Sequence, residues 1–195
     1  MEILFIFFAY LIGSISFAIL ICKLCGLPDP RTQGSGNPGA TNVLRMAGKK
    51  TAAAVLLLDG LKGFIPVIIA SQVLNFSVLW LGFTVFAVVL GHMFPLFFRF
   101  QGGKGVATYF GAMLAFSWPI GLTLLIVWAV VAKLFHYSSL AAIVAAICAP
   151  IIAFLLYQPY VVTPLILTSI LVIYRHKDNI VRLNNRTESK IGQKT

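Results

Sequence analysis

The residues Ile3–Cys22, ILFIFFAYLIGSISFAILIC, form an uncharged apolar run of 20 residues. A helix of about 20 residues crosses the hydrocarbon core of a bilayer, which is about 30 Å thick. A secretory signal peptide would start with a basic region and carry a shorter apolar core before its cleavage site, whereas this chain starts Met1–Glu2. The run therefore predicts a retained transmembrane helix.

The composition extends this prediction to the whole chain. Of 195 residues, 59% are hydrophobic and 10% are charged, whereas soluble domains average about 45–50% and about 25%. Fifteen Lys and Arg stand against five Asp and Glu, a net charge of +10. In a membrane protein, an excess of basic residues orients the chain in the bilayer and binds anionic ligands. We therefore expect no nucleic-acid partner. We expect one membrane-embedded domain, residues 1–195.

Further apolar runs predict further spans. Within Val106–Ala132, the sequence Ser117–Trp118–Pro119 interrupts the run, because proline breaks helices and restricts the residue before it. Two short antiparallel helices, Val106–Phe116 and Pro119–Ala132, are expected there. The fold class is an all-α integral membrane protein with about seven transmembrane helical segments, some short or broken. The other expected spans are Ala52–Ala70, Val78–Phe98, Tyr137–Tyr157 and Tyr160–Tyr174.

The distribution of basic residues predicts the orientation. With the hairpin at residues 106–132, the N-terminus lies outside and the C-terminus lies in the cytoplasm. Fourteen of the fifteen Lys and Arg then fall on the cytoplasmic side, as the positive-inside rule requires, and only Lys62 lies within a span. A single crossing at residues 106–132 would divide the basic loops between the two sides.

The first polar motif is Gly34–Asn42, GSGNPGATN. Three glycines within six residues let successive backbone N–H groups converge on an anion. Thr41 or Asn42 is expected to cap a following helix, whose N-terminus also favours an anion. A flexible loop of turn residues is the alternative. Side-chain donors come from Ser35, Asn37 and Arg45.

The second motif is Gly102–Gly103–Lys104–Gly105, which directly precedes an expected helix at Val106. It predicts another anion site at a helix N-terminus, now with a lysine. It differs from a Walker A loop, because Gly105 stands where that loop has Ser or Thr. An ordinary turn is the alternative.

The third motif is Arg175–Asn179, RHKDN, followed by Arg182. If the last helix continues past the membrane, His176 and Asn179 stand at positions i and i+3 and share a face. Basic residues next to a membrane also serve as a topology signal, which is the alternative. The presence of His176 and Asn179 on one face favours a functional site over a topology signal alone.

Three ionisable residues lie inside the expected spans or at their ends. Asp59 and Lys62 stand at i and i+3 among Gly60, Gly63 and Pro66. Charged side chains inside a membrane are functional candidates, but this spacing favours a structural ion pair that holds a broken helix open. His92 is expected to brace the loop after the third span.

Several kinds of chemistry are disfavoured. Five carboxylates in total are few for a Mg²⁺ site, and no His, Cys and carboxylate cluster has zinc spacing. We expect no metal and no cofactor. The sequence contains neither a G-x-S-x-G elbow nor a His-x4-Asp pairing. A reaction on an already activated substrate fits better than covalent catalysis.

These motifs together resemble the bacterial acyl-phosphate:glycerol-3-phosphate acyltransferase (PlsY) family. The matching segments cover essentially the whole chain in order and spacing. Arg186 departs from the family pattern, which commonly has glycine before Thr187–Glu188. The segments are GSGNPGATNVLR at Gly34–Arg45, DGLKG at Asp59–Gly63, GHMFPLFFRFQGGKGVAT at Gly91–Thr108 and RHKDNIVRL at Arg175–Leu183.

The resemblance implies an enzyme of phospholipid biosynthesis in the bacterial inner membrane, with its active site on the cytoplasmic face. It would transfer a fatty acyl group from acyl phosphate to the 1-hydroxyl of glycerol 3-phosphate, and would release lysophosphatidic acid and phosphate. Its partners would be these substrates and membrane lipids, without direct use of acyl-CoA or acyl carrier protein.

The resemblance also implies roles for the motif residues. We expect Ser35, Gly36, Asn37, Pro38, Gly39 and Ala40 to bind acyl phosphate, and Gly102, Gly103 and Lys104 to form the second phosphate site. Glycerol 3-phosphate is expected to contact Arg45, Lys104, His176 and Asn179, with Ser139 as a weaker candidate. Ser35, Arg45, His176 and Asn179 form the expected catalytic set, with either His176 or a substrate phosphate oxygen as the base. Structural roles are expected for Asp59, Lys62, His92 and Glu188.

A small anion channel or phosphate-lipid transporter is the alternative from another functional class. It would need polar residues along the spans and a charged outer vestibule. Apart from Asp59 and Lys62, the expected spans are apolar and their outer turns are uncharged.

Overall fold

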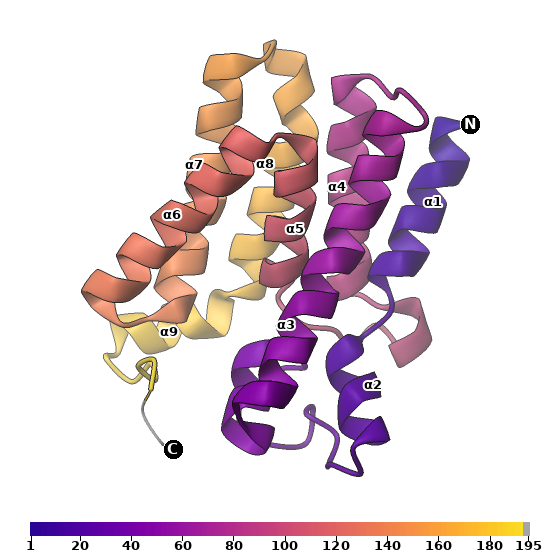
Figure 1. Cartoon of the computed structure of the whole chain (residues 1–195). Helices are drawn as coiled ribbons and strands as arrows, with labels where there is room; N and C mark the ends of the chain where they lie inside the picture. The colour runs from indigo at the N-terminus through magenta and orange to yellow at the C-terminus, as the bar shows by residue number, and fades with distance from the viewer. Residues whose placement is uncertain (193–195) are drawn as a thin grey trace.

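The computed structural model describes residues 1–192, and these residues are helical throughout, joined by turns and loops (Figure 1). Lys194, which belongs to the expected cytoplasmic basic set, lies outside the described residues. The helices are α1 (Glu2–Gly13), α2 (Phe17–Leu24), α3 (Ala40–Gln72), α4 (Val78–Met93), the 3-10 helix η1 (Leu96–Phe98), α5 (Val106–Phe116), α6 (Trp118–Phe135), α7 (Ser138–Leu156), α8 (Pro159–Arg175) and α9 (Lys177–Asn184).

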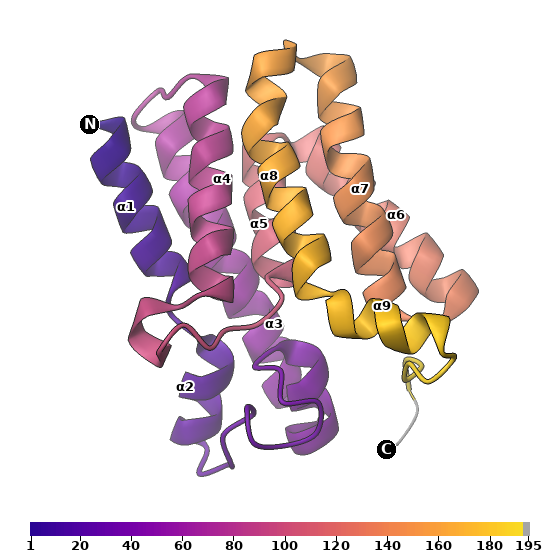
Figure 2. The same ribbon diagram turned by 180° about the vertical axis from the view of Figure 1, so that it is seen from behind.

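The helices form one bundle around α5. Figures 1 and 2 show α1, α3 and α4 in one half and α6, α7 and α8 in the other, with α4 against α8. Helix α5 contacts α3, α4 and α6, and most of its side chains are buried. The N-terminus lies at one end of the bundle, and the loops after α2 and α4 lie with α9 at the other end.

The expected multi-pass helical fold is confirmed. Among residues 1–192, five helical segments are long and apolar enough to cross a membrane, and a sixth is added if α8 and α9, bent by 56°, count as one span. The expected seven segments are all helical, but α5 has only 11 residues. The expected span Val78–Phe98 is confirmed and consists of α4 and η1. One expected boundary was wrong, because α3 starts at Ala40 rather than Ala52.

The break at Ser117 lies where the sequence placed it. Ser117 is extended (φ −159°, ψ 107°) between α5 and α6, and Pro119 occupies the first turn of α6. Proline is favoured there because the first turn needs no N–H donor from it. A Cβ on Gly121 would lie 2.5 Å from the Cα of Leu114. The two helices therefore close into a tight hairpin, whose open end faces the same end of the bundle as α9 (Figure 1).

The first span is broken, which was not expected. Ile3–Cys22 forms α1 and α2 with Ser14–Ser16 between them. Gly13 packs closely on α4, where an added Cβ would lie 2.1 Å from the carbonyl oxygen of Val88. Close approach through small residues is typical of helices in membranes.

Helix α3 runs unbroken through the segment expected to be open. Gly60 and Gly63 lie against α5, where a Cβ on Gly63 would come within 2.0 Å of the carbonyl oxygen of Thr108. The interruption in α3 lies instead at Gly48, whose φ of 81° and ψ of −179° are outside the helical region. The glycines near Asp59 thus serve helix packing, and the expectation of a broken helix there was wrong.

Candidate active site

One cavity brings residues of all three polar motifs together. It has a volume of about 260 Å³ and lies at the end of the bundle that carries α9. The loop after α2, the loop before α5 and the α8–α9 corner each contribute to it. Its lining residues are Ser35, Gly36, Asn37, Phe94, Gly102, Lys104, Tyr174, Arg175, Lys177, Asp178 and Arg182.

Asn42 organises the first loop from inside α3. Its side-chain amide donates to the carbonyl oxygens of Pro30 (2.8 Å) and Gln33 (3.0 Å), and its Oδ1 accepts from the backbone N–H of Ser35 (3.0 Å). The N-cap of α3 is Gly39, so neither Thr41 nor Asn42 caps this helix as expected. The buried Asn42 amide instead fixes the loop that presents Ser35.

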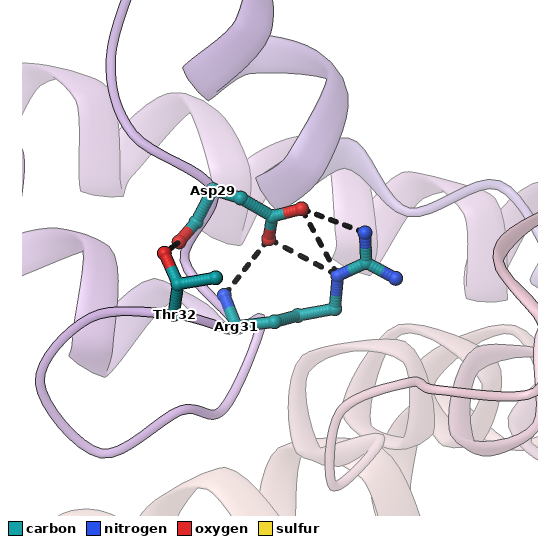
Figure 3. A network of polar contacts seen from close by, with 3 residues as sticks. All are labelled: Asp29, Arg31 and Thr32. Atoms are coloured by element: carbon teal, nitrogen blue, oxygen red, sulfur yellow. Dashed lines mark hydrogen bonds and ion pairs between the residues drawn. The ribbon is translucent and has the colours of Figure 1, made fainter.

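The turn before this loop has its own polar network (Figure 3). Arg31 Nη2 lies 2.6 Å from Asp29 Oδ2, and the Arg31 backbone N–H donates to Asp29 Oδ1 at 2.9 Å. Thr32 Oγ1 donates to the Asp29 carbonyl. The Arg31 side chain holds the pKa of Asp29 below its usual value. A neighbouring cavity of about 280 Å³, lined by Ile19, Lys23, Leu27 and Asp29, contains no motif residue.

The second loop is held between two elements. The first element is α4: the Gly103 N–H donates to the carbonyl oxygen of His92 at 3.3 Å, and a Cβ on Gly103 would lie 2.4 Å from His92 Nε2. From α8, Arg175 donates to the carbonyl oxygens of Gly102 (2.6 Å) and Gly103 (3.2 Å). Gly105, with φ 77°, is the N-cap of α5. A side chain at 103 would not fit, and a left-handed N-cap favours glycine.

Lys104 connects the second loop to the third motif. Its ammonium group donates to Asn179 Oδ1, and burial lowers the pKa of Lys104 to about 8. Asn179 Nδ2 donates to Glu188 Oε1 at 2.6 Å. Lys104 and Asn179 are therefore joined directly, although 75 positions separate them.

Glu188 completes this network from the segment after α9. It accepts from Ser139 Oγ at 2.7 Å, as well as from Asn179, and Arg182 Nε lies 2.7 Å from its Oε2. Burial alone would raise the pKa of Glu188, but these three donors lower it below its usual value. The Glu188 carboxylate is therefore ionised at neutral pH and ties α7 to α9.

His176 lies buried at the corner between α8 and α9. Its Nδ1 is 2.8 Å from the Val172 carbonyl oxygen, and a carbonyl oxygen only accepts, so Nδ1 carries the proton and Nε2 is the acceptor in the neutral ring. Burial lowers the pKa of His176 to about 4. The ring is neutral at pH 7. The chain stays helical past this residue but bends by 56° between α8 and α9.

The structure separates the other expected residues from the cavity lining. Arg45 is exposed on the first part of α3, and Ser139 directs its hydroxyl to Glu188. Pro38 packs near Gly103, whose added Cβ would lie 3.1 Å from the Pro38 carbonyl oxygen, and Ala40 begins α3.

Lys62 and Asp59 form an ion pair of 2.8 Å with both side chains buried. His92 Nδ1 is 3.1 Å from Thr108 Oγ1 on α5 and 3.7 Å from Asp59 Oδ1. Among residues 1–192, no group of three or more His, Cys, Asp or Glu has the arrangement of a metal site.

Sequence reasoning missed several lining residues. Tyr174 directly precedes the third motif, which was the available signal, whereas Phe94 lies eight positions before Gly102. Arg175 and Arg182 were recognised only as basic residues of the third motif. Lys177 and Asp178 stand between His176 and Asn179, and a bend at His176 is what brings both to the cavity.

Comparison with known sequences identifies relatives over nearly the full chain. A family model described as glycerol-3-phosphate acyltransferase matches residues 3–186. The glycerol-3-phosphate acyltransferase of Escherichia fergusonii is 53% identical, over 97% of this chain and 91% of the relative. That of Colwellia psychrerythraea is 54% identical, over 95% and 94%.

Solved structures give the same similarity. A crystal structure of PlsY, an integral membrane glycerol 3-phosphate acyltransferase, in its glycerol 3-phosphate form matches with a TM-score of 0.91 and 46% identity, over 98% of this chain and 96% of that one. The lysophosphatidic acid form matches with a TM-score of 0.89 and 45% identity, over 98% and 95%.

Proposed function

We infer that this chain, which belongs to the glycerol-3-phosphate acyltransferase family, takes its acyl group from acyl phosphate. As a member of that family it is a membrane enzyme of phospholipid synthesis that acylates glycerol 3-phosphate and produces lysophosphatidic acid. The channel or transporter alternative is set aside, because the family is enzymatic. The donor is the part of the function that we propose.

The observation that carries this proposal is the pairing of two glycine loops at one cavity. The Gly34–Ala40 loop and the Gly102–Gly105 loop both line it, and loops of this type bind phosphate groups through backbone N–H donors. Two phosphorylated substrates, a donor and an acceptor, fit this arrangement. PlsY structures in glycerol 3-phosphate and lysophosphatidic acid forms support the acceptor and the product.

We assign the first loop, with Ser35, to acyl phosphate and the second loop, with Lys104, to glycerol 3-phosphate. Lys104 is charged, which suits a compact dianion that arrives from water. The first loop has no charged side chain before Arg45 and suits a phosphate attached to a membrane-dissolved chain. Arg45 is exposed and would meet the soluble substrate at the entrance. Asn179 and His176 would orient the acceptor.

The proposed reaction needs no enzyme nucleophile. The 1-hydroxyl oxygen attacks the carbonyl carbon of acyl phosphate, the ester bond forms, the bond from that carbon to the phosphate oxygen breaks, and phosphate leaves. Lys104 and the loop N–H groups would offset the negative charge. The pKa of His176, about 4, is below the second pKa of a phosphate monoester, about 6. This order favours a substrate phosphate oxygen as the proton acceptor, with His176 Nε2 orienting the hydroxyl.

We propose that the cavity faces the cytoplasm of a bacterial cell and that the N-terminus lies outside the inner membrane. The support is the positive-inside rule. The start of α3, the loop before α5, the end of α6 and α9 lie at the same end of the bundle, and they carry Arg45, Lys104, Lys133 and Arg182. The turns after α3 and α7 contain no charged residue.

The test uses the purified chain with labelled glycerol 3-phosphate and a defined acyl phosphate. Acyl-CoA and acyl carrier protein thioester serve as control donors. Lysophosphatidic acid should form with acyl phosphate alone, and formation should persist in excess EDTA because the proposed charge neutralisation comes from side chains and backbone. Equal or faster turnover with acyl-CoA would refute the donor assignment.

A further inference from the structure

We propose that Arg175 is a positioning residue that fixes the conformation of the Gly102–Gly105 loop, and through it the position of Lys104. The proposal rests on the proposed function of the cavity. Arg175 is the last residue of α8. It donates from Nη2 to the Gly102 carbonyl (2.6 Å) and from Nε to the Gly103 carbonyl (3.2 Å).

This pair of bonds requires the shape of a guanidinium group. The Nε and Nη2 donors of arginine lie in one plane and can bond two acceptors side by side, whereas lysine is a point charge on a flexible stem. The guanidinium carbon also lies 5.3 Å from the ring centre of Phe94, which places the cation over an aromatic face. The Phe94 ring thus holds the fork in the orientation that both carbonyls need.

The loop needs an external constraint because of its composition. Two adjacent glycines allow the peptide planes at 102 and 103 to rotate with little steric cost. A rotated plane would turn a carbonyl oxygen toward a bound phosphate, which would repel it. Arg175 holds both carbonyl oxygens, and His92 holds the Gly103 N–H from the opposite side. The two planes are therefore fixed by contacts from α8 and α4.

Fixing these planes also fixes Lys104. The peptide group that Arg175 bonds through the Gly103 carbonyl is the one that carries the Lys104 N–H, since a peptide unit is planar. The Lys104 side chain leaves the backbone from this fixed point and reaches Asn179 on α9. Arg175 and Asn179 lie on either side of the α8–α9 corner. This corner therefore positions both the residue that holds the loop, Arg175, and the residue that Lys104 contacts, Asn179.

A direct role for Arg175 makes a different prediction. Arg175 also lines the cavity, so its charge alone could attract a phosphate group. Arg175→Lys keeps the charge and loses the fork. If Arg175 acts by charge, this variant retains most of its use of glycerol 3-phosphate. If Arg175 positions the loop, Arg175→Lys behaves like Arg175→Ala.

The experiment measures KM for each substrate and kcat for the wild type, Arg175→Lys and Arg175→Ala. We expect both variants to raise KM for glycerol 3-phosphate roughly 10- to 150-fold, the range for losing hydrogen bonds to a charged group, with KM for acyl phosphate within about twofold. Lys133→Ala, which removes an exposed cation at the end of α6, is the matched control and should resemble the wild type. Misfolding would lower apparent kcat and leave both KM values unchanged, and it would count against the proposal.

Chemical rescue gives an independent readout. Guanidinium ion at low, non-denaturing concentration should lower the glycerol 3-phosphate KM of Arg175→Ala, because it restores a planar fork, whereas methylammonium at equal concentration should not. Retention of wild-type KM in Arg175→Lys, or equal rescue by both cations, would overturn the positioning role. An inactive wild type would instead refute the proposed function itself.

Discussion

The ammonium nitrogen of Lys62 lies 2.5 Å from the backbone carbonyl oxygen of Ile15, in the break between α1 and α2. The same ammonium group pairs with the buried Asp59 carboxylate at 2.8 Å, one helical turn away on α3. A broken helix leaves backbone groups without partners, and hydrocarbon offers none. Lys62 therefore satisfies a backbone carbonyl at the break, and Asp59 neutralises the charge that does so.

This arrangement predicts that Asp59 and Lys62 cannot exchange positions without loss of stability. The double variant Asp59→Lys, Lys62→Asp keeps both charges but exchanges their positions, so a carboxylate replaces the donor to the Ile15 carbonyl. We expect it to lose about 3–5 kcal/mol of unfolding free energy, as when one partner of a buried pair is removed. Thermal unfolding in detergent measures the loss.

Asp59→Asn, Lys62→Gln is the control for the reversed pair. Its amide group at position 62 can still donate toward the Ile15 carbonyl without burying charge, so it should unfold at a higher temperature than the reversed variant. Equal stability of the two double variants would show that only mutual neutralisation matters.

The two glycine loops should separate the two substrates kinetically. Lys104→Ala is expected to raise KM for glycerol 3-phosphate roughly 10- to 150-fold, the range for losing an interaction of about 1.5–3 kcal/mol, with a much smaller effect on acyl phosphate. Ser35→Ala should show the opposite preference. A fall in kcat as well would mean that Lys104 also acts in the transition state. The reverse pattern of KM changes would exchange the assignments of the loops.

The pKa of Lys104, about 8, predicts a pH dependence of binding. Lys104 is charged below this value and neutral above it, so KM for glycerol 3-phosphate should be constant near pH 7 and rise as pH increases through about 8. Lys104→Arg stays charged over this range and should remove the rise, even if its KM is higher throughout. A wild-type KM that is flat to about pH 9.5 would contradict the role of the Lys104 charge.

The hairpin predicts that both ends of the α5–α6 segment label from the cytoplasm. Thr108 near the start of α5 is fully buried, so single cysteines belong at Gln101 and Lys133, which are exposed. In a Cys-free background, a membrane-impermeant thiol reagent should label both positions in inverted vesicles, whose outer surface is the cytoplasmic face, and neither position in intact cells. Labelling from opposite sides would exclude the proposed orientation.

Features that depend on local sequence could be predicted. Each polar motif interrupts an apolar chain, and so the sequence indicated where the helices end and which residues meet at one end of the bundle. The break at Ser117 was predictable because proline follows at 119. The pairing of Asp59 with Lys62 was predictable from one helical turn.

Features that depend on contacts between residues distant in the chain could not be predicted from the sequence. At the break, Gly13, Ser14 and Ser16 are a weak local signal within an uncharged run, and the Lys62 side chain that bonds to Ile15 is 47 positions away. Arg175 reads as one more basic residue next to a membrane until its bond to Gly102, 73 positions away, is seen. Asn42 is a residue type that often caps helices, but its side chain bonds to the preceding loop, because the carbonyl oxygens of Pro30 and Gln33 lie within reach.

The hydrogen bonds from Arg175 to the glycine loop and from Ser139 to Glu188 have a consequence for biosynthesis. A ribosome adds about 5–20 residues per second, so the glycine loop precedes Glu188 by on the order of ten seconds. During that interval the earlier helices can enter the membrane, but Arg175, which bonds the loop, and Asn179, which bonds Lys104, are made only near its end. A chain that stalls within its last span would occupy the bilayer as an incomplete protein without an assembled cavity, and acyl transfer would begin only once translation has passed the final helix.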